Sequence, residues 1–287
     1  MTVGERLSEA ESLARRAGSD ATGWDARLLL AHAVGHGKPL ALDPRDEVAA
    51  AAVSSFRELW SRRIEGAPVQ HLLGEWDFFG RPFFVDARAL VPRPETELLI
   101  ETALLEASAA RRVLDLGTGS GILAVTWLAE RRESRAIAVD VSTGALALAR
   151  RNAARHGVLG RLELVAGDWI SALSDDAVFD LALSNPPYLA IGDVDALSST
   201  VRDHDPAEAL FSGRDGLDAI RRLLGGVARH LSAGAPFLFE IGAGQADHVA
   251  FEVGARREWR LDRIVPDLSA VPRVAVLRRI QVSGRSG

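Results

Sequence analysis

From Arg112 onward, this sequence alternates between strand-forming and helix-forming segments, and this alternation limits the possible folds most strongly. We predict strands at residues 112–116, 136–140, 162–166, 179–184, 236–241, 261–265 and 274–279. Helical patterns separate most of these segments, which is typical of an α/β fold with a mostly parallel, doubly wound sheet. Ligands of such sheets bind beyond the carboxyl ends of the strands, so we expect the functional residues there.

The residues before this pattern have a different character. Three segments place apolar side chains at helical spacing, and each is followed by a glycine that signals a helix end: residues 1–17, 24–34 and 46–64. Strand-forming aromatic residues follow, with Gly80 and Pro82 indicating a hairpin, and then a helix over residues 95–109 with Thr96 as its cap. We therefore predict three parts: a small helical bundle domain (1–66), a hairpin linker with a connecting helix (67–110) and the α/β domain (111–287).

Charge and composition exclude several classes of function. The formal net charge is -5, which counts against a nucleic acid partner because phosphate backbones attract basic surfaces. The chain has no cysteine and no HExxH pattern, so we expect neither disulfides nor a metal site. The amino terminus lacks the organisation of a signal peptide, and no segment approaches the roughly 18 apolar residues of a membrane span. We expect a soluble, cytoplasmic protein.

The first predicted strand runs into a glycine-rich turn that precedes an apolar helix. Glycines let the backbone approach a ligand closely, and the helix amino terminus offers free N–H groups. Nicotinamide dinucleotide sites satisfy the same spacing, but Asp115 suits the ammonium group of a methionine moiety better than a pyrophosphate. We therefore favour S-adenosylmethionine as the cofactor. Its predicted ligands in this turn are Asp115, Gly117, Thr118, Gly119, Ser120 and Gly121.

Acidic residues also follow the next two predicted strands. Asp140 ends the second strand, where a carboxylate can accept hydrogen bonds from both hydroxyls of a ribose. Asp168 and Trp169 follow the third strand, where the carboxylate can meet the adenine amino group and the indole can cover the ring. Because these strand ends share one edge of the sheet, we predict that the three residues complete the nucleoside site.

The fourth predicted strand ends in the sequence Asn185-Pro186-Pro187-Tyr188. Two consecutive prolines stiffen the backbone and remove two N–H donors, which leaves a corner rich in hydrogen-bond acceptors. The Asn185 side chain and the Pro186 carbonyl can each accept one N–H of a planar NH2 group, while Tyr188 stacks against it. We therefore predict N-methylation with Asn185, Pro186 and Tyr188 as catalytic residues and Asn185–Tyr188 as the substrate site. The acceptor is either adenine in nucleic acid or glutamine in protein.

The whole chain resembles the release factor glutamine N5-methyltransferases, which modify the glutamine of the Gly-Gly-Gln loop in peptide chain release factors. The stretch Val91–Glu97 (VPRPETE) discriminates best, since related ribosomal-protein glutamine methyltransferases carry a serine-proline variant there and DNA adenine methyltransferases lack the segment. The other resembling positions are Asp25 with Ala26, Pro68–Gly74, the glycine turn, Asp140, Asp168 with Trp169, Asn185–Tyr188, Val201–Leu210 and Glu240–Gly242. The sequence departs from the family at Asp205, where glutamate is usual, and at Ser269 with Ala270.

This resemblance implies a seven-stranded, Rossmann-like class I methyltransferase sheet. It also implies that Gly117–Gly121, Asp140, Trp169 and Asn185 bind the cofactor and that Asn185–Tyr188 bind the substrate glutamine. The helical domain would grip the release factor, and Arg93, Glu95 and Thr96 would lie near the cleft. We expect release factors as partners, no direct nucleic acid binding and a monomer. The competing hypotheses are an adenine methyltransferase that flips its base into the Asn185 corner, a ribosomal-protein glutamine methyltransferase and a non-catalytic binding module.

Overall fold

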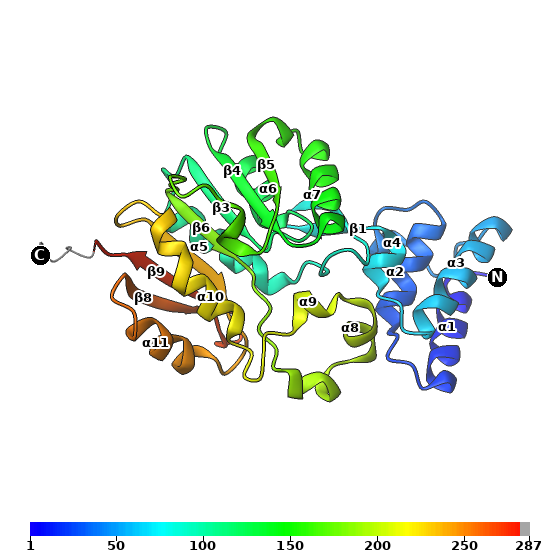
Figure 1. The fold of residues 1–287 in the computed structure, drawn as a ribbon. Helices are drawn as coiled ribbons and strands as arrows, with labels where there is room; N and C mark the ends of the chain where they lie inside the picture. The colour runs from blue at the N-terminus through cyan, green and yellow to red at the C-terminus, as the bar shows by residue number, and fades with distance from the viewer. Residues whose placement is uncertain (282–287) are drawn as a thin grey trace, which may run out of the picture. The chain divides into compact units, whose positions relative to one another are not determined.

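The computed structural model describes residues 1–281, and its main feature is a seven-stranded sheet (Figure 1). In spatial order the strands are β5 (Leu162–Ala166), β4 (Arg135–Asp140), β3 (Arg112–Leu116), β6 (Leu181–Ser184), β7 (Pro236–Glu240), β9 (Pro272–Arg279) and β8 (Trp259–Pro266). All the predicted strands are therefore confirmed. β6 is shorter than predicted because Phe179 forms only an isolated bridge, to Leu231.

The order of the strands creates the place where a ligand can bind. Strands from β5 to β7 run parallel, whereas β9 is antiparallel to β7 and β8. The strand order reverses at β3, which lies between β4 and β6. Where the order reverses, the connections after neighbouring strands run to opposite faces of the sheet, which opens a crevice beyond the carboxyl ends of the strands. The register pairs Leu116 with Ser184, and the Ser184 hydroxyl donates a hydrogen bond to the Leu116 carbonyl over 2.7 Å.

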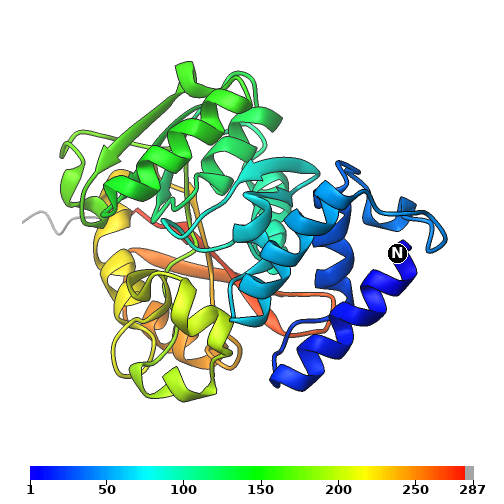
Figure 2. The same cartoon turned by 90° about the vertical axis from the view of Figure 1, so that its right-hand side faces the viewer.

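Helices cover both faces of this sheet (Figures 1 and 2). One apolar cluster joins the sheet to α5, α6 and α7 and encloses Trp127 completely, while a second joins it to α10 and α11. The helices are α5 (Glu97–Glu106), α6 (Ile122–Glu130), α7 (Thr143–Arg155), α9 (Ala207–Leu210), α10 (Asp218–Gly226) and α11 (Ala246–Gly254), with short 3-10 helices at Pro94–Thr96, Leu159–Arg161, Trp169–Ala172, Ile191–Ala196 and Val227–His230. Val113 of β3 belongs to the first cluster and Leu114 with Leu116 to the second, as expected for a sheet buried on both faces.

The chain forms two compact units. The first comprises residues 1–76 and 197–205, and the second comprises residues 77–196 and 206 onward. The first unit contains α1 (Val3–Ala17), α2 (Gly23–Ala33), a 3-10 helix (Pro39–Ala41), α3 (Ala50–Ile64), α4 (Val69–Leu73) and α8 (Ser199–His204). The predicted division at residues 66 and 110 remains a prediction, but contacts within the chain group residues 197–205 with the amino-terminal helices. The buried side chain of Arg63 pairs there with Asp20 and Asp25.

Most of the predicted helices and the hairpin have the expected positions, with one clear exception. β1 (Glu75–Phe78) and β2 (Arg81–Phe84) form the hairpin, and Gly80 sits in its turn at φ +67°. The predicted start of the third helix at residue 46 is wrong, since α3 begins at Ala50. The Asp46 carbonyl instead accepts a hydrogen bond from the N–H of Val3, so this segment pairs with the amino terminus. No helix among residues 1–281 is both long enough and apolar enough to span a bilayer.

A buried carboxylate joins β3 to α6. Asp115 has no exposed surface, and its Oδ2 accepts hydrogen bonds from the Thr118 hydroxyl (2.6 Å) and the Ala124 N–H (3.1 Å). Within the described residues, its Oδ1 is buried without a hydrogen-bond partner. Complete burial raises the pKa of Asp115 to about 7, against the lowering effect of these two donors. The carboxylate thus closes the turn between the strand and the helix at a cost in desolvation.

Gly121 allows α6 and α7 to approach each other closely. Its φ is +84°, and a Cβ at this position would lie 3.0 Å from the Cβ and 3.2 Å from the Cα of Ala149 in α7. Both the backbone conformation and the space therefore require glycine. Gly157, at φ +68°, has the same backbone conformation but open space around it.

We expect Gly121→Ala to lower the free energy of unfolding by about 2–4 kcal/mol, because conformational strain and overpacking add. Gly157→Ala is the matched control and should cost only the strain, about 1–2 kcal/mol. Urea unfolding followed by tryptophan fluorescence measures both. Equal losses for the two variants would show that the contact with Ala149 relaxes freely.

The buried Asp115 carboxyl makes the stability of the protein depend on pH. The pKa of Asp115 is about 7 in the folded chain and near 3.8 when unfolded, so between these values the folded state holds a proton that the unfolded chain has released. Stability from this group therefore falls as pH rises from 4 to 7. Asp115→Asn cannot titrate in this way, so it should gain stability relative to the parent as pH rises. We expect its unfolding free energy minus that of the parent to increase by on the order of 2–4 kcal/mol from pH 4 to 7. Parallel stability curves for the two proteins would contradict the assignment.

Candidate active site

The second unit contains a cavity of about 710 Å³ beyond the carboxyl ends of β3, β4, β5 and β6. Its wall includes many residues that the sequence singled out: Gly117, Thr118, Gly119, Ser120, Asp140, Asp168, Trp169, Asn185 and Pro187. The rest of the wall comes mainly from residues 88–93 and from the segment after Pro206. Arg93 and Thr96, which the sequence placed near the cleft, also line it. Five other predicted residues are not part of the wall: Glu95, Asp115, Gly121, Pro186 and Tyr188.

Asp140 and the glycine turn hold each other in place. The Gly119 N–H donates to Asp140 Oδ2 over 2.8 Å, and the Ser142 N–H donates to Oδ1 over 2.9 Å. The N–H groups of Gly117 and Thr118 both donate to the Val139 carbonyl, at 2.9 and 3.1 Å. These bonds fix the turn against the end of β4 and set the carboxylate of Asp140 on the cavity wall.

Trp169 forms a second part of the wall, next to the glycine turn. Its φ of +54° is unusual for a large residue, and such strain is typical of functional sites. A Cβ on Gly117 would lie only 3.2 Å from the Trp169 ring. Glycine at this position therefore lets the indole pack directly against the backbone of the turn.

Asp168 has a partner that the sequence analysis missed. The Arg222 guanidinium of α10 donates to Asp168 Oδ2, and both side chains lie on the cavity wall about half exposed. Arg222 sits within an ordinary amphipathic helix, so no local signal could have identified it. One carboxylate oxygen of Asp168 is thereby committed to an ion pair.

The end of β6 is tied to two distant, buried residues. Asn185 Nδ2 donates to Thr96 Oγ1 over 3.1 Å, and the Thr96 hydroxyl donates to Glu240 Oε2 over 2.7 Å. The Tyr188 hydroxyl donates to the other oxygen of Glu240 over 3.3 Å, and burial together with the Glu240 charge raises the pKa of Tyr188 above its ordinary value. The predicted capping role of Thr96 is wrong, because its side chain makes no cap bond and points to Glu240.

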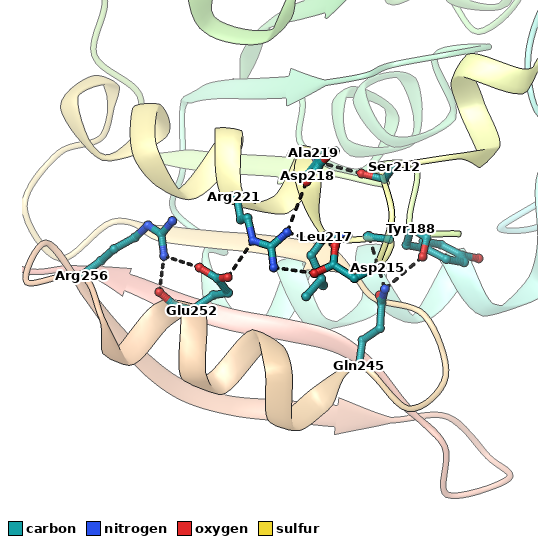
Figure 3. A network of polar contacts seen from close by, with 11 residues as sticks. Tyr188, Ser212, Asp215, Leu217, Asp218, Ala219, Arg221, Gln245, Glu252 and Arg256 are labelled. Carbon is teal, nitrogen blue, oxygen red and sulfur yellow. Dashed lines mark hydrogen bonds and ion pairs between the residues drawn. The ribbon is translucent and has the colours of Figure 1, made fainter. Parts of the chain in front are cut away.

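Gln245 holds the loop after Tyr188, as Figure 3 shows. Its Nε2 donates to the carbonyls of Tyr188 (2.9 Å) and Gly216 (3.3 Å), and its Oε1 accepts from the Gly242 N–H (2.8 Å). The side chain thus joins the corner after β6 to the turn before α10. Sequence reasoning missed Gln245, since it lies outside every motif that we recognised.

Arg221 orders the turn before α10, as Figure 3 shows. Its guanidinium pairs with Asp215 (2.6 Å), Asp218 (3.2 Å) and Glu252 (2.7 Å), and Glu252 also pairs with Arg256. Exposed single pairs stabilise little, but one cation shared by three carboxylates restricts all of them.

Among residues 1–281, no group of three or more histidine, aspartate or glutamate side chains is placed to hold a metal ion.

Comparisons with known proteins agree with this geometry. Residues 94–202 match the family model "Methyltransferase small domain", and residues 5–74 match "PrmC N-terminal domain". The fold is similar to that of a solved methyltransferase from Pyrococcus furiosus, with a TM-score of 0.53, 17% identity and coverage of 80% of this chain and 100% of that one.

Curated relatives are much closer in sequence. The release factor glutamine methyltransferase of Cereibacter sphaeroides is 43% identical over 97% of this chain and 99% of its own length. The corresponding protein of Nitratidesulfovibrio vulgaris is 38% identical over 95% of this chain and 94% of its own. With such identity over nearly the full length of both chains, the protein belongs to the release factor glutamine methyltransferase family.

Proposed function

We propose that this chain transfers a methyl group from S-adenosylmethionine to the side-chain amide nitrogen, N5, of the glutamine in the Gly-Gly-Gln motif of peptide chain release factors. The observation that carries the proposal is the position of Asn185, whose side chain lies on the wall of the same cavity as the glycine turn and Asp140. The likeness to relatives named for this activity supports the choice of substrate.

The cavity fits the cofactor in size and chemistry. Its volume of about 710 Å³ lies within the range of roughly 300–1,000 Å³ that is usual for small-molecule sites. Gly117 and Gly119 carry no side chains that would occupy the cavity, and Asp140 adds a carboxylate at the end of β4. When bound, S-adenosylmethionine supplies a methyl group that its sulfonium charge makes electrophilic.

We assign the cofactor contacts to the residues of the wall. Gly117, Thr118, Gly119 and Ser120 would line one side, Asp140 would accept from the ribose hydroxyls, and Asp168 with Trp169 would meet the adenine. Gly121 and Asp115 would act from behind the wall, by packing α6 against α7 and by closing the turn. A direct contact of Asp115 with the methionine ammonium group stays a prediction.

An amide nitrogen is a weak nucleophile, and we propose that the corner at Asn185–Tyr188 compensates for this by orienting the target amide. The nitrogen lone pair is delocalised by the resonance that also gives peptide bonds a rotation barrier of about 18–20 kcal/mol. We propose that Asn185 Oδ1 and the Pro186 carbonyl accept the two N–H groups of the target, while Pro187 keeps the corner rigid and Tyr188 stacks on the amide plane. Orientation of this kind can contribute on the order of 7–11 kcal/mol. The transfer would form the N–CH3 bond and break the S–CH3 bond, so that S-adenosylhomocysteine leaves, and the nitrogen would release one N–H proton to solvent.

The remaining assignments concern partners and location. We propose that the enzyme is a cytoplasmic monomer, that release factors are its protein substrates and that it does not bind nucleic acid directly. The formal net charge of -5 supports the last point, since binding to a phosphate backbone depends on basic surface. We propose that the helical unit, residues 1–76 and 197–205, binds the release factor; it includes the match to the "PrmC N-terminal domain".

Methyl transfer from labelled S-adenosylmethionine tests the proposed function directly. We expect label in a release factor with an intact Gly-Gly-Gln motif and none in the matched release factor in which this glutamine is alanine. A ribosomal protein and duplex DNA serve as competing acceptors. Label in either of these, but not in the release factor, would establish an alternative enzyme, and label in no acceptor would favour a non-catalytic module.

We expect Asn185→Ala to depress turnover by about a hundredfold or more, because one acceptor for the target amide is lost, while cofactor affinity changes by less than about tenfold. Single-turnover kinetics with a release factor give the first quantity, and calorimetric titration with S-adenosylhomocysteine gives the second. Unimpaired turnover in the variant would remove Asn185 from the mechanism.

A further inference from the structure

Glu240 is a carboxylate in an unusual place. Only 1% of the residue is exposed, at the end of the interior strand β7, and Thr96, which bonds to it, is completely buried. Burying a charge is costly unless hydrogen bonds compensate for the lost water. The pKa of Glu240 is raised above its ordinary value, mainly by burial and also by the negative charge of Glu95. The hydrogen bonds from the Thr96 and Tyr188 hydroxyls and the positive charge of Arg273 lower this pKa and partly offset the rise.

The bonds around Glu240 favour its ionised form. Both carboxylate oxygens receive a hydroxyl donor, Oε2 from Thr96 and Oε1 from Tyr188. An ionised carboxylate can only accept hydrogen bonds, so the single proton of the Thr96 hydroxyl is directed to Glu240. Toward its other partner, Asn185, the Thr96 oxygen can then offer only a lone pair.

This arrangement determines which end of the Asn185 amide faces Thr96. The oxygen and the NH2 group of an asparagine have nearly the same shape, so sterics alone cannot distinguish the two orientations. Because Thr96 presents an acceptor, the NH2 group must face it, as the Nδ2–Oγ1 distance of 3.1 Å reflects. Oδ1 is then left as the end of Asn185 that can accept a hydrogen bond from a substrate.

We propose that Thr96 and Glu240 are positioning residues that hold the Asn185 side-chain amide with its oxygen available to the substrate NH2 group. In the opposite orientation the Asn185 NH2 group would meet the substrate NH2 group, and two donors cannot bond. The inference rests on the proposed methylation of an amide nitrogen and adds the residues that make the corner selective for one. It also explains why Glu240 remains in the core, where an apolar residue would pack at lower cost.

Thr96→Val tests the proposal, because valine keeps the shape of threonine and removes both the donor and the acceptor. We expect kcat for release factor methylation to fall by about tenfold to a hundredfold, as follows from the loss of one or two buried hydrogen bonds. The dissociation constant of S-adenosylhomocysteine should change by less than about threefold. Thr96→Ser retains the hydroxyl and should restore kcat to within about threefold of the parent.

Thr126→Val in α6 is the matched control. Thr126 is also completely buried, but within residues 1–281 its hydroxyl has no hydrogen-bond partner. The same substitution there should leave kcat unchanged. A purely structural role for Thr96 predicts instead that valine and serine variants lose activity in proportion to their loss of folded protein, which the unfolding midpoint reports.

Glu240→Gln supplies an independent test that does not depend on the folding of the valine variant. Glutamine keeps the shape but can donate to Thr96, so the hydroxyl proton of Thr96 becomes free to face Asn185, and kcat should fall. Since both residues act through one chain of hydrogen bonds, Thr96→Val combined with Glu240→Gln should be little slower than Thr96→Val alone.

The outcomes separate this inference from the proposed function. If the parent protein fails to methylate release factors, the proposed function fails before any variant is compared. If the parent is active, any one of three results overturns the positioning role: full kcat in Thr96→Val, equal losses in the valine and serine variants, or multiplicative losses in the double variant.

Discussion

The hydrogen bond between the Ser184 hydroxyl and the Leu116 carbonyl joins the two strands on which the site depends. It connects the last residues of β3 and β6, and each is followed at once by a functional segment, the glycine turn on one side and Asn185 on the other. A shift of register by one residue would reverse the faces of β6 and carry Asn185 away from the cavity wall. The distance between the cofactor and acceptor segments is therefore set inside the sheet, away from the loops themselves.

The buried carboxylates of Asp115 in β3 and Glu240 in β7 have different roles. Asp115 accepts bonds from a hydroxyl and a backbone N–H of its own turn, so it shapes the path from β3 into α6. Among the described residues, the donors to Glu240 are the hydroxyls of Thr96 and Tyr188, and Thr96 in turn accepts a hydrogen bond from Asn185. Both carboxylates cost desolvation energy, and each is compensated by donors that lie within a few residues of the cavity wall. Burial of these two carboxylates costs folding stability, and their hydrogen bonds fix the orientation of groups near the cavity.

Local patterns in the sequence were sufficient to predict the sheet, the glycine turn and the corner at Asn185. Each of these depends on a few consecutive residues whose backbone preferences agree, such as glycines at positive φ or two successive prolines. The start of α3 and the role of Thr96 could not be predicted in this way, because Val3 and Glu240 are remote in sequence. Arg222 and Gln245 were missed for the same reason: they reach the site only through tertiary packing.

The path of the chain also relates the two units to the site. Pro187 and Pro206 both line the cavity, yet residues 197–205 between them pack with the amino-terminal helices, where Thr200 donates to Asp20. The segment that follows the acceptor corner therefore belongs to the helical unit before it returns to the cavity wall. Residues 197–205 are thus covalently continuous with two segments of the cavity wall, one ending before them and one beginning at Pro206.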